Sequence, residues 1–283
     1  MKSLCIKTNN NKIIDYLLKK FDNTSLNETY ITVKEFVHYK NIILHYKDDN
    51  VLLFINILAN ILTKCIIQFY EKNLINNFIN LNYFYFSKLE KDKISSNTLE
   101  LINNSEDSNT KYDLINNTLF KYINEHHSLY LNGFINFRLQ DYLEFLNTKI
   151  DFAVNKFLID KEYLEFINIL KLYINSESIN SKTNHLHLIY KDKDSIIIND
   201  NKEIISCNEN IAKAKYISDI SFSSNDLALN TLLNLLPKKI TIHLTDGYVD
   251  EFINTLKLIF QERVIICEDC DICNMYKSKK IFK

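Results

Sequence analysis

Residues 239–267 read KITIHLTDGYVDEFINTLKLIFQERVIIC. Residues 240–244 have the pattern of a strand, residues 249–260 repeat apolar side chains at a helical period, and residues 264–267 are again strand-like. Strand, helix and strand at this spacing predict a βαβ unit, whose two strands lie parallel in one sheet. The stretch therefore predicts an α/β fold for the C-terminal third of the chain.

Three cysteines follow the second predicted strand in the pattern C-x-x-C-x-x-C: Cys267, Cys270 and Cys273. Thiols at this spacing can converge on one soft metal ion. His243 lies near the end of the first strand, and the carboxyl ends of parallel strands meet at the same edge of a sheet. We therefore predict a metal site formed by these four residues.

The identity of this site stays open at the level of the sequence. Zinc takes four such ligands, whereas an iron–sulfur cluster is the rival, because the spacing matches the first three cysteines of a ferredoxin run. The fourth cysteine and the proline of that run are absent here. Redox-active thiols, or cysteines without a chemical role, are further alternatives. The other candidates for a fourth ligand are the remaining cysteines, Cys5, Cys65 and Cys207.

The composition is that of a folded protein, with 46% hydrophobic and 24% charged residues in 283. Its two glycines, Gly133 and Gly247, stand alone, so the glycine-rich phosphate loops of nucleotide-binding proteins are absent. Serine-hydrolase elbows, zinc-protease motifs and kinase signatures are also absent from the sequence. We find no catalytic arrangement and favour a protein that is not an enzyme.

Charge and hydropathy indicate a cytoplasmic protein. A net charge of -1 argues against a nucleic-acid partner, and we expect the short basic tail, 277–283, to be solvated. The most apolar stretch, 51–69, carries a polar residue at every fourth position and includes Lys64, which would cost about 3 kcal/mol in a membrane. The N-terminus turns polar by Thr8, so we expect no secretory signal and no membrane span. Six cysteines then point to a reducing cytosol rather than to disulfides.

We predict a mixed α+β fold in three parts. Residues 1–50 form a small α/β element with a strand, a helix and a hairpin. Residues 51–178 are mainly helical, with a polar linker near 91–110 and a break near 160–161. Residues 185–283 form the C-terminal α/β unit, which contains a hairpin, a helix and the βαβ unit and ends in the cysteine cluster.

Two smaller features belong to this last part. A second polar linker is predicted over 175–184. His185 and His187 alternate with leucines in the predicted hairpin and so share one face. We interpret that face as solvated, with chelation by the histidine pair as the alternative.

Residues 132–146 read NGFINFRLQDYLEFL and contain one of only two arginines, Arg138. On one continuous helix, Arg138 would lie near Phe134 and Tyr142, at the margin of the apolar face. A guanidinium can stack on a ring and present a planar fork of donors, which lysine cannot. We interpret Arg138, with Asp141 and Tyr142, either as a tie to another element or as a site that binds a partner or an anion.

The same stretch, continued by DFAVNKFLIDKEYLEFINILKLYI over 151–174, resembles the YtxC family of sporulation proteins from endospore-forming Firmicutes. The later LLNLLPKKITIHL, 232–244, is similar to the C-terminal part of that family. The resemblance covers roughly 51–273 and implies a cytoplasmic protein with a part in sporulation. It brings no activity, cofactor or catalytic residue. We therefore expect action through contacts with a protein partner, with a metal- or thiol-dependent role of the cysteine cluster as the alternative.

Overall fold

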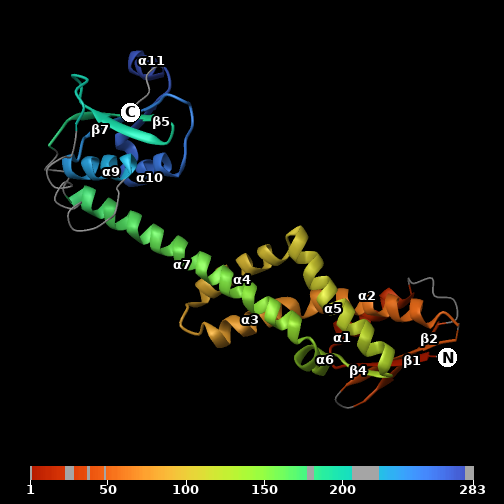
Figure 1. Cartoon of the computed structure of the whole chain (residues 1–283). Helices are drawn as coiled ribbons and strands as arrows, with labels where there is room; N and C mark the ends of the chain where they lie inside the picture. Colours follow the sequence, from red (N-terminus) through yellow and green to blue (C-terminus); the bar gives the residue numbers. More distant parts are fainter. Residues whose placement is uncertain are drawn as a thin grey trace, which may run out of the picture. The chain divides into compact units, whose positions relative to one another are not determined.

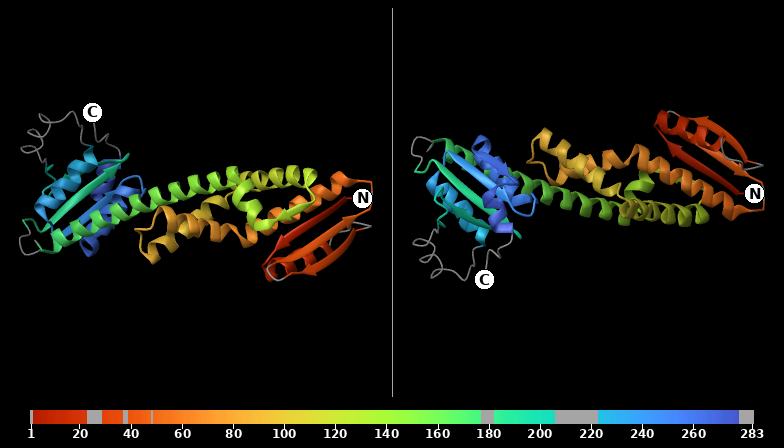
Figure 2. Two further views of the ribbon diagram at one scale, coloured as in Figure 1. Left: turned by 90° about the horizontal axis from the view of Figure 1, so that it is seen from below. Right: turned by 90° about the horizontal axis from the view of Figure 1, so that it is seen from above.

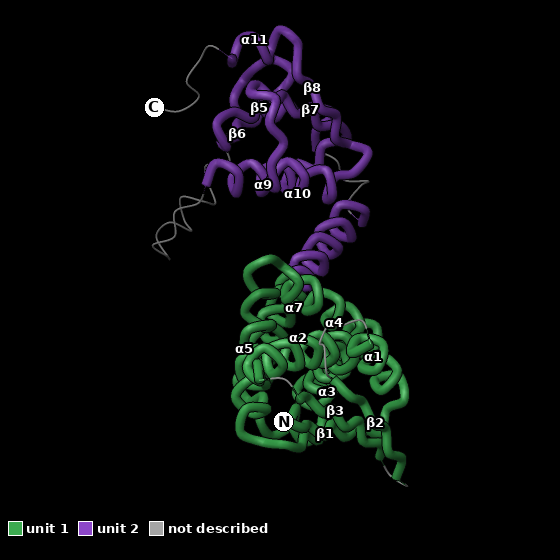
Figure 3. The backbone as a smooth tube through the Cα atoms, turned by 90° about the vertical axis from the view of Figure 1, so that its right-hand side faces the viewer, with its two compact units in different colours: residues 1–159 green, residues 160–283 purple. Residues whose placement is uncertain are grey.

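The computed structural model describes residues 2–22, 29–36, 39–47, 49–176, 182–205 and 223–277. The fold is α+β, as predicted: 64% of the described residues are helical, and these residues form two mixed sheets of four strands each. Contacts divide the chain into two compact units, Met1–Ile159 and Asp160–Lys283 (Figure 3). The division falls inside the long helix α7, Gln140–Ser176. The division into three parts stays a prediction.

Unit 1 contains a sheet with the strand order β2-β3-β1-β4. Its strands are β1 (Lys2–Thr8), β2 (Thr29–Glu35), β3 (Lys40–Tyr46) and β4 (Ser128–Tyr130). β3 pairs antiparallel with β1 and with β2, and Figure 2 shows these red and orange strands side by side. The predicted N-terminal strand and hairpin are therefore confirmed. β4, which pairs parallel with β1, has only three residues and is too short to carry a recognisable pattern.

The helices of unit 1 are α1 (Asn11–Asp22), α2 (Val51–Phe69), α3 (Glu71–Asn82), α4 (Lys88–Ile102), α5 (Ser105–Glu125), α6 (Leu131–Arg138) and the first part of α7. The predicted linker near 91–110 is wrong, because α4 and the start of α5 occupy it. A capping box between Ser87 and Glu90 begins α4. Ile94, Ser95, Thr98 and Ile102 are buried, and Leu99 and Leu101 pack partly against the core, so most of the contact with the core is made by the second half of the helix.

By length and composition, α2 is the one helix among the described residues that could cross a membrane. Half of its most apolar window is buried inside the protein. One of its polar residues, Asn60, accepts a hydrogen bond from the Tyr112 hydroxyl of α5 at 2.9 Å. These contacts are those of a core helix and agree with the expectation of no membrane span.

The stretch around Arg138 is not one continuous helix. α6 ends at Arg138, Leu139 leaves helical geometry at φ -96° and ψ 39°, and α7 begins at Gln140. The turn buries Leu139 and Tyr142 and leaves Arg138 exposed. The break expected near 160–161 is absent, because α7 continues to Ser176. The charged residues at that point lie on its exposed side.

A buried ion pair and a tyrosine hydroxyl form a network that joins three helices of unit 1. Lys111 Nζ on α5 lies 2.9 Å from Glu71 Oε1 on α3, and both side chains are at most 5% exposed. The Tyr142 hydroxyl on α7 donates to Glu71 Oε2 at 2.9 Å, and Lys111 also donates to Asn103 at 2.9 Å. Burial and the Glu71 carboxylate raise the pKa of Tyr142, so the phenol keeps its proton and remains a donor. Every charged group in this network therefore has a partner.

Lys111→Met should lower the free energy of unfolding by about 3–5 kcal/mol, because it leaves the Glu71 carboxylate buried without a cation. Lys149→Met is the matched control, since Lys149 pairs with Asp107 at 2.6 Å but both side chains are about one quarter exposed. The control should cost less than about 1 kcal/mol. Urea unfolding of the two variants measures both values, and equal losses would contradict the role given to the buried pair.

Unit 2 contains the second sheet, with the strand order β6-β5-β7-β8. Its strands are β5 (His185–Lys191), β6 (Asp194–Ile198), β7 (Lys239–Leu244) and β8 (Val264–Cys267). β5 and β6 form the predicted antiparallel hairpin. β7 pairs parallel with both β5 and β8, and α10 (Glu251–Phe260) connects β7 to β8. The predicted βαβ unit is therefore confirmed.

The two faces of this second sheet differ in character. Helices α9 (Ser224–Leu235) and α10 cover one face, and the short α11 (Asp271–Lys277) lies on the other (Figures 1 and 3). Ile240, Ile242 and Leu244 of β7 belong to the apolar core on the helical face. Because side chains alternate along a strand, Thr241 and His243 point to the opposite face, toward α11.

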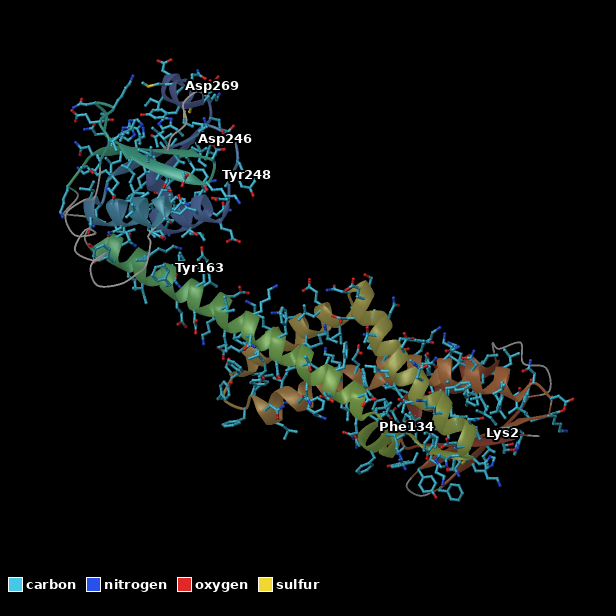
Figure 4. The ribbon with its side chains drawn as sticks, viewed as in Figure 1. Lys2, Phe134, Tyr163, Asp246, Tyr248 and Asp269 are labelled. Atoms are coloured by element: carbon cyan, nitrogen blue, oxygen red, sulfur yellow. The ribbon has the colours of Figure 1, made fainter. Side chains whose placement is uncertain are left out.

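The C-terminal part of α7 packs within unit 2. Its residues Ile167 and Ile174 are buried in the same apolar core. The Tyr163 hydroxyl, labelled in Figure 4, lies 2.7 Å from the Thr255 hydroxyl of α10. The helical face of the second sheet is thus closed by three helices, whereas the face toward α11 carries polar side chains and the cysteine cluster.

Candidate metal centre

The residues of the predicted metal site come together. His243 on β7 pairs directly with Cys267, the last residue of β8, so both side chains leave the sheet on the same face. The chain then turns through Asp269, labelled in Figure 4, and enters α11. This turn returns Cys270 and Cys273 over the face that carries His243. The ligand atoms of the four residues all lie within 4.8 Å of one another.

The distances in this cluster are close to those of a tetrahedral site. His243 Nδ1 lies 3.3 Å from Cys270 Sγ and 3.4 Å from Cys273 Sγ. Cys273 Sγ lies 3.6 Å from Cys270 Sγ and 3.9 Å from Cys267 Sγ. With Zn–S bonds of about 2.3 Å and Zn–N bonds of about 2.0 Å, a tetrahedron separates two sulfurs by about 3.8 Å and a sulfur from a nitrogen by about 3.5 Å. One ion fits among the four atoms with small adjustments.

Burial sets the protonation of the imidazole. His243 is 2% exposed, and its desolvation, followed by the nearby His187 and His185, lowers its pKa to about 4. At neutral pH the ring is therefore uncharged and offers one nitrogen lone pair. That is the form in which histidine binds a metal.

The thiols influence one another. Burial and the neighbouring thiols raise the pKa of Cys273 to about 12, and burial also raises the pKa of Cys267. Burial opposes ionisation of Cys270 as well, but the backbone N–H of Cys273 and the other thiols outweigh it and lower the Cys270 pKa. Without a cation the three sulfurs cannot all be thiolates, because like charges at this distance repel. A divalent ion would remove that obstacle.

A second group of possible ligands adjoins the first. His185 and His187 on β5 and Asp200 beyond β6 bring their ligand atoms within 4.8 Å of one another. Asp200 Oδ1 lies 2.7 Å from His185 Nδ1 and 3.2 Å from His187 Nε2. Desolvation works against it, but hydrogen bonds from His187 and His185 lower the pKa of Asp200. The face that we interpreted as solvated is thus occupied by a hydrogen-bonded cluster.

The two groups touch through their histidines. His187 Nδ1 lies 2.9 Å from His243 Nε2, and the rings are stacked with centroids 5.1 Å apart. The sequence pattern indicated that His185 and His187 share a face, but not that β5 pairs parallel with β7, which places that face beside His243. Nothing in the sequence indicated that Asp200 belongs to this group, apart from its position as an acidic residue that follows a predicted strand.

The predicted partner site around Arg138 is dispersed. Tyr142 is fully buried and donates to Glu71, so it offers no surface to a partner. Arg138 and Asp141 are exposed on either side of the helix break. Within the described part of the chain, no hydrogen bond or ion pair reaches the Arg138 guanidinium. A role for Arg138 and Asp141 in binding stays a prediction.

Among the described residues, the group of four contains neither Cys5 nor Cys65. Cys5 and Cys65 belong to unit 1, and Cys207 lies outside the described residues. Of the basic tail 277–283, only Lys277 is described.

Fold and site together define an α+β protein with a compact group of three cysteines and one histidine where the parallel strands β7 and β8 end. The YtxC-like family matches residues 56–265, so the chain belongs to that family. The match includes His187, Asp200 and His243 but ends before Cys267. No curated protein and no solved structure matches the chain.

Zinc binding should weaken steeply as the pH falls from about 8 to about 6, because each thiol must lose its proton to become a ligand. Because the pKa values of Cys267 and Cys273 are raised, these two thiols are protonated in the metal-free protein. With a pKa of about 4, His243 gives up none in this range. Calorimetry in buffers of different ionisation enthalpy should detect up to about three protons released per ion. Binding without proton release would contradict this assignment of ligands.

Proposed function

We propose that this YtxC-like protein binds one zinc ion through His243, Cys267, Cys270 and Cys273. The observation that carries the proposal is the convergence of four ligand atoms, from two strands, the turn after β8 and α11, at near-tetrahedral distances. Four protein ligands leave no open position for water or substrate, which is typical of structural rather than catalytic zinc. The proposal therefore agrees with a protein that is not an enzyme.

The small size of α11 supports a structural role for the ion. This helix has seven residues, too few to be stable alone, and Cys273 is its one buried residue. Apolar packing is therefore insufficient to hold it against the sheet. Ligation through Cys270 and Cys273 would supply the missing stabilisation, because the free energy of metal binding contributes directly to folding.

The spacing of the sulfurs favours a single ion over an iron–sulfur cluster. An iron–sulfur cluster holds its cysteine sulfurs farther apart than a single ion does. Here Cys273 Sγ lies 3.6 Å from Cys270 Sγ and 3.9 Å from Cys267 Sγ. The histidine nitrogen at 3.3 Å and 3.4 Å from two sulfurs completes a set of four. Cysteine and histidine in this combination are common zinc ligands.

Elemental analysis of anaerobically purified full-length protein should find about one zinc ion per chain. Replacing Cys267, Cys270 and Cys273 together with serine should abolish binding and lower the melting temperature. Cys5→Ser, which changes a cysteine of unit 1, is the matched control and should leave the zinc content unchanged. Wild-type protein with zinc at the background level, or with iron and sulfide instead, would overturn the proposal.

We further propose that the protein acts in sporulation, in the cytoplasm of an endospore-forming Firmicute, through contacts with another protein. The family resemblance supports the setting. Exposed Arg138 and its neighbour Phe137, which is 77% exposed, support the contacts, because an arginine beside an exposed aromatic ring is typical of interface residues.

Arg138→Lys should preserve the fold and the positive charge but weaken capture of the partner from sporulating cells, because lysine lacks the planar fork of donors. Lys156→Arg, a comparable exchange at an exposed cation of α7, should leave capture unchanged. Affinity capture followed by mass spectrometry compares the variants with wild type. Equal recovery of the same protein by all three would remove Arg138 from the proposed surface.

A further inference from the structure

We propose that His187 and Asp200 are positioning residues of the metal centre: they hold His243 in the tautomer whose Nδ1 lone pair faces the three sulfurs. The proposal rests on the zinc site proposed above. It gives a role to the second group of possible ligands, His185, His187 and Asp200, which do not themselves contact the zinc ion.

The geometry is a chain of hydrogen bonds across neighbouring strands. His243 uses its two ring nitrogens differently, with Nδ1 toward the sulfurs and Nε2 at 2.9 Å from His187 Nδ1. The other nitrogen of His187, Nε2, lies 3.2 Å from Asp200 Oδ1. His185 contacts the same oxygen through Nδ1 at 2.7 Å and reaches the Thr241 hydroxyl through Nε2 at 2.8 Å. Metal-binding histidines commonly have such partners on their second nitrogen.

The number of protons on each ring determines which nitrogen donates in each of these hydrogen bonds. A neutral imidazole has one N–H and one lone pair, and an ionised carboxylate only accepts. Asp200 therefore requires a hydrogen on His187 Nε2, which leaves a lone pair on His187 Nδ1. That lone pair accepts the Nε2–H of His243, so the lone pair of His243 is on Nδ1 and faces the sulfurs. His185 fits the same scheme, since its Nδ1–H donates to Asp200 and its Nε2 accepts from the Thr241 hydroxyl.

The opposite direction would prevent ligation. If His187 donated from Nδ1 to His243 Nε2, neutral His243 would carry its hydrogen on Nδ1 and point it at Cys270 and Cys273. Asp200 disfavours this arrangement, because His187 Nε2 would then present a lone pair to a carboxylate. The carboxylate, although 64% exposed, thus selects the tautomer of a histidine that is 2% exposed.

The same count limits the number of ions. A second metal held by His185, His187 and Asp200 would need the lone pair of His187 Nε2, the atom that carries the hydrogen when His243 is a ligand. The two groups therefore do not bind metal together through neutral rings. We expect one ion per chain, in the cysteine-containing site.

The test compares zinc affinity in full-length wild type, His187→Leu and His187→Gln, by competition with a chromophoric chelator. Leucine removes the acceptor for the His243 Nε2–H, and affinity should fall by about 10- to 100-fold. Glutamine has a side-chain carbonyl that can accept the same hydrogen, so it should restore most of the affinity. His126→Leu, which makes the same exchange at an exposed histidine of unit 1, should leave affinity unchanged.

A second measurement separates positioning from folding. Circular dichroism of the metal-free leucine and glutamine variants should match wild type. The absorption spectrum of the cobalt(II)-loaded leucine variant at saturation should keep the bands of the wild-type site, because its ligands are unchanged. A merely structural role for His187 would reduce affinity equally in both variants.

The outcomes distinguish this proposal from the zinc site itself. Wild type without zinc would refute the site. Three other results would keep zinc binding but overturn the positioning role. These are unchanged zinc affinity in His187→Leu, an equal loss of zinc affinity in both His187 variants, and two zinc ions per wild-type chain.

Discussion

The parallel pairing of β7 with β8 is the constraint on which the rest of unit 2 depends. It sets His243 opposite Cys267, and the turn after Cys267 then returns Cys270 and Cys273 over the same face. A slip of one residue along β7 would move His243 into the core and Ile242 to the site. The apolar residues on the helical face of β7 therefore fix the site as firmly as the ligands do, since they hold the register.

The proposed metal site would in turn stabilise α11, a segment that contributes one buried residue. α11 buries only Cys273 and lies on the sheet face away from α9 and α10 (Figure 1). An ion bound there would attach α11 to the sheet. The hydrogen bonds from His243 through His187 to Asp200 would connect that ion to β5 and to the residues that follow β6. With the proposed ion bound, unit 2 would combine two kinds of stabilisation, apolar packing on one face of its sheet and metal ligation on the other. Unit 1 relies on packing and on the buried Glu71–Lys111 pair.

Local signals in the sequence were sufficient for the βαβ unit and for the grouping of His243 with the three cysteines, because strand period, helix period and cysteine spacing act over a few residues. Nonlocal features were missed. The pairing of β5 with β7, which places His187 beside His243, leaves no mark on either strand. The helix at 88–102 was missed because two of its four buried residues, Ser95 and Thr98, are polar, which leaves a weak apolar pattern. The turn at Leu139 was missed because both flanking segments are helical.

X-ray absorption at the zinc edge of the full-length protein tests the central claim most directly, because it reports the number and kind of atoms around the ion. The account predicts about three sulfurs at about 2.3 Å and one nitrogen at about 2.0–2.1 Å. A zinc shell made only of nitrogen and oxygen would contradict it. Protein that contains no zinc, and whose iron shows scattering from neighbouring irons, would contradict it as well.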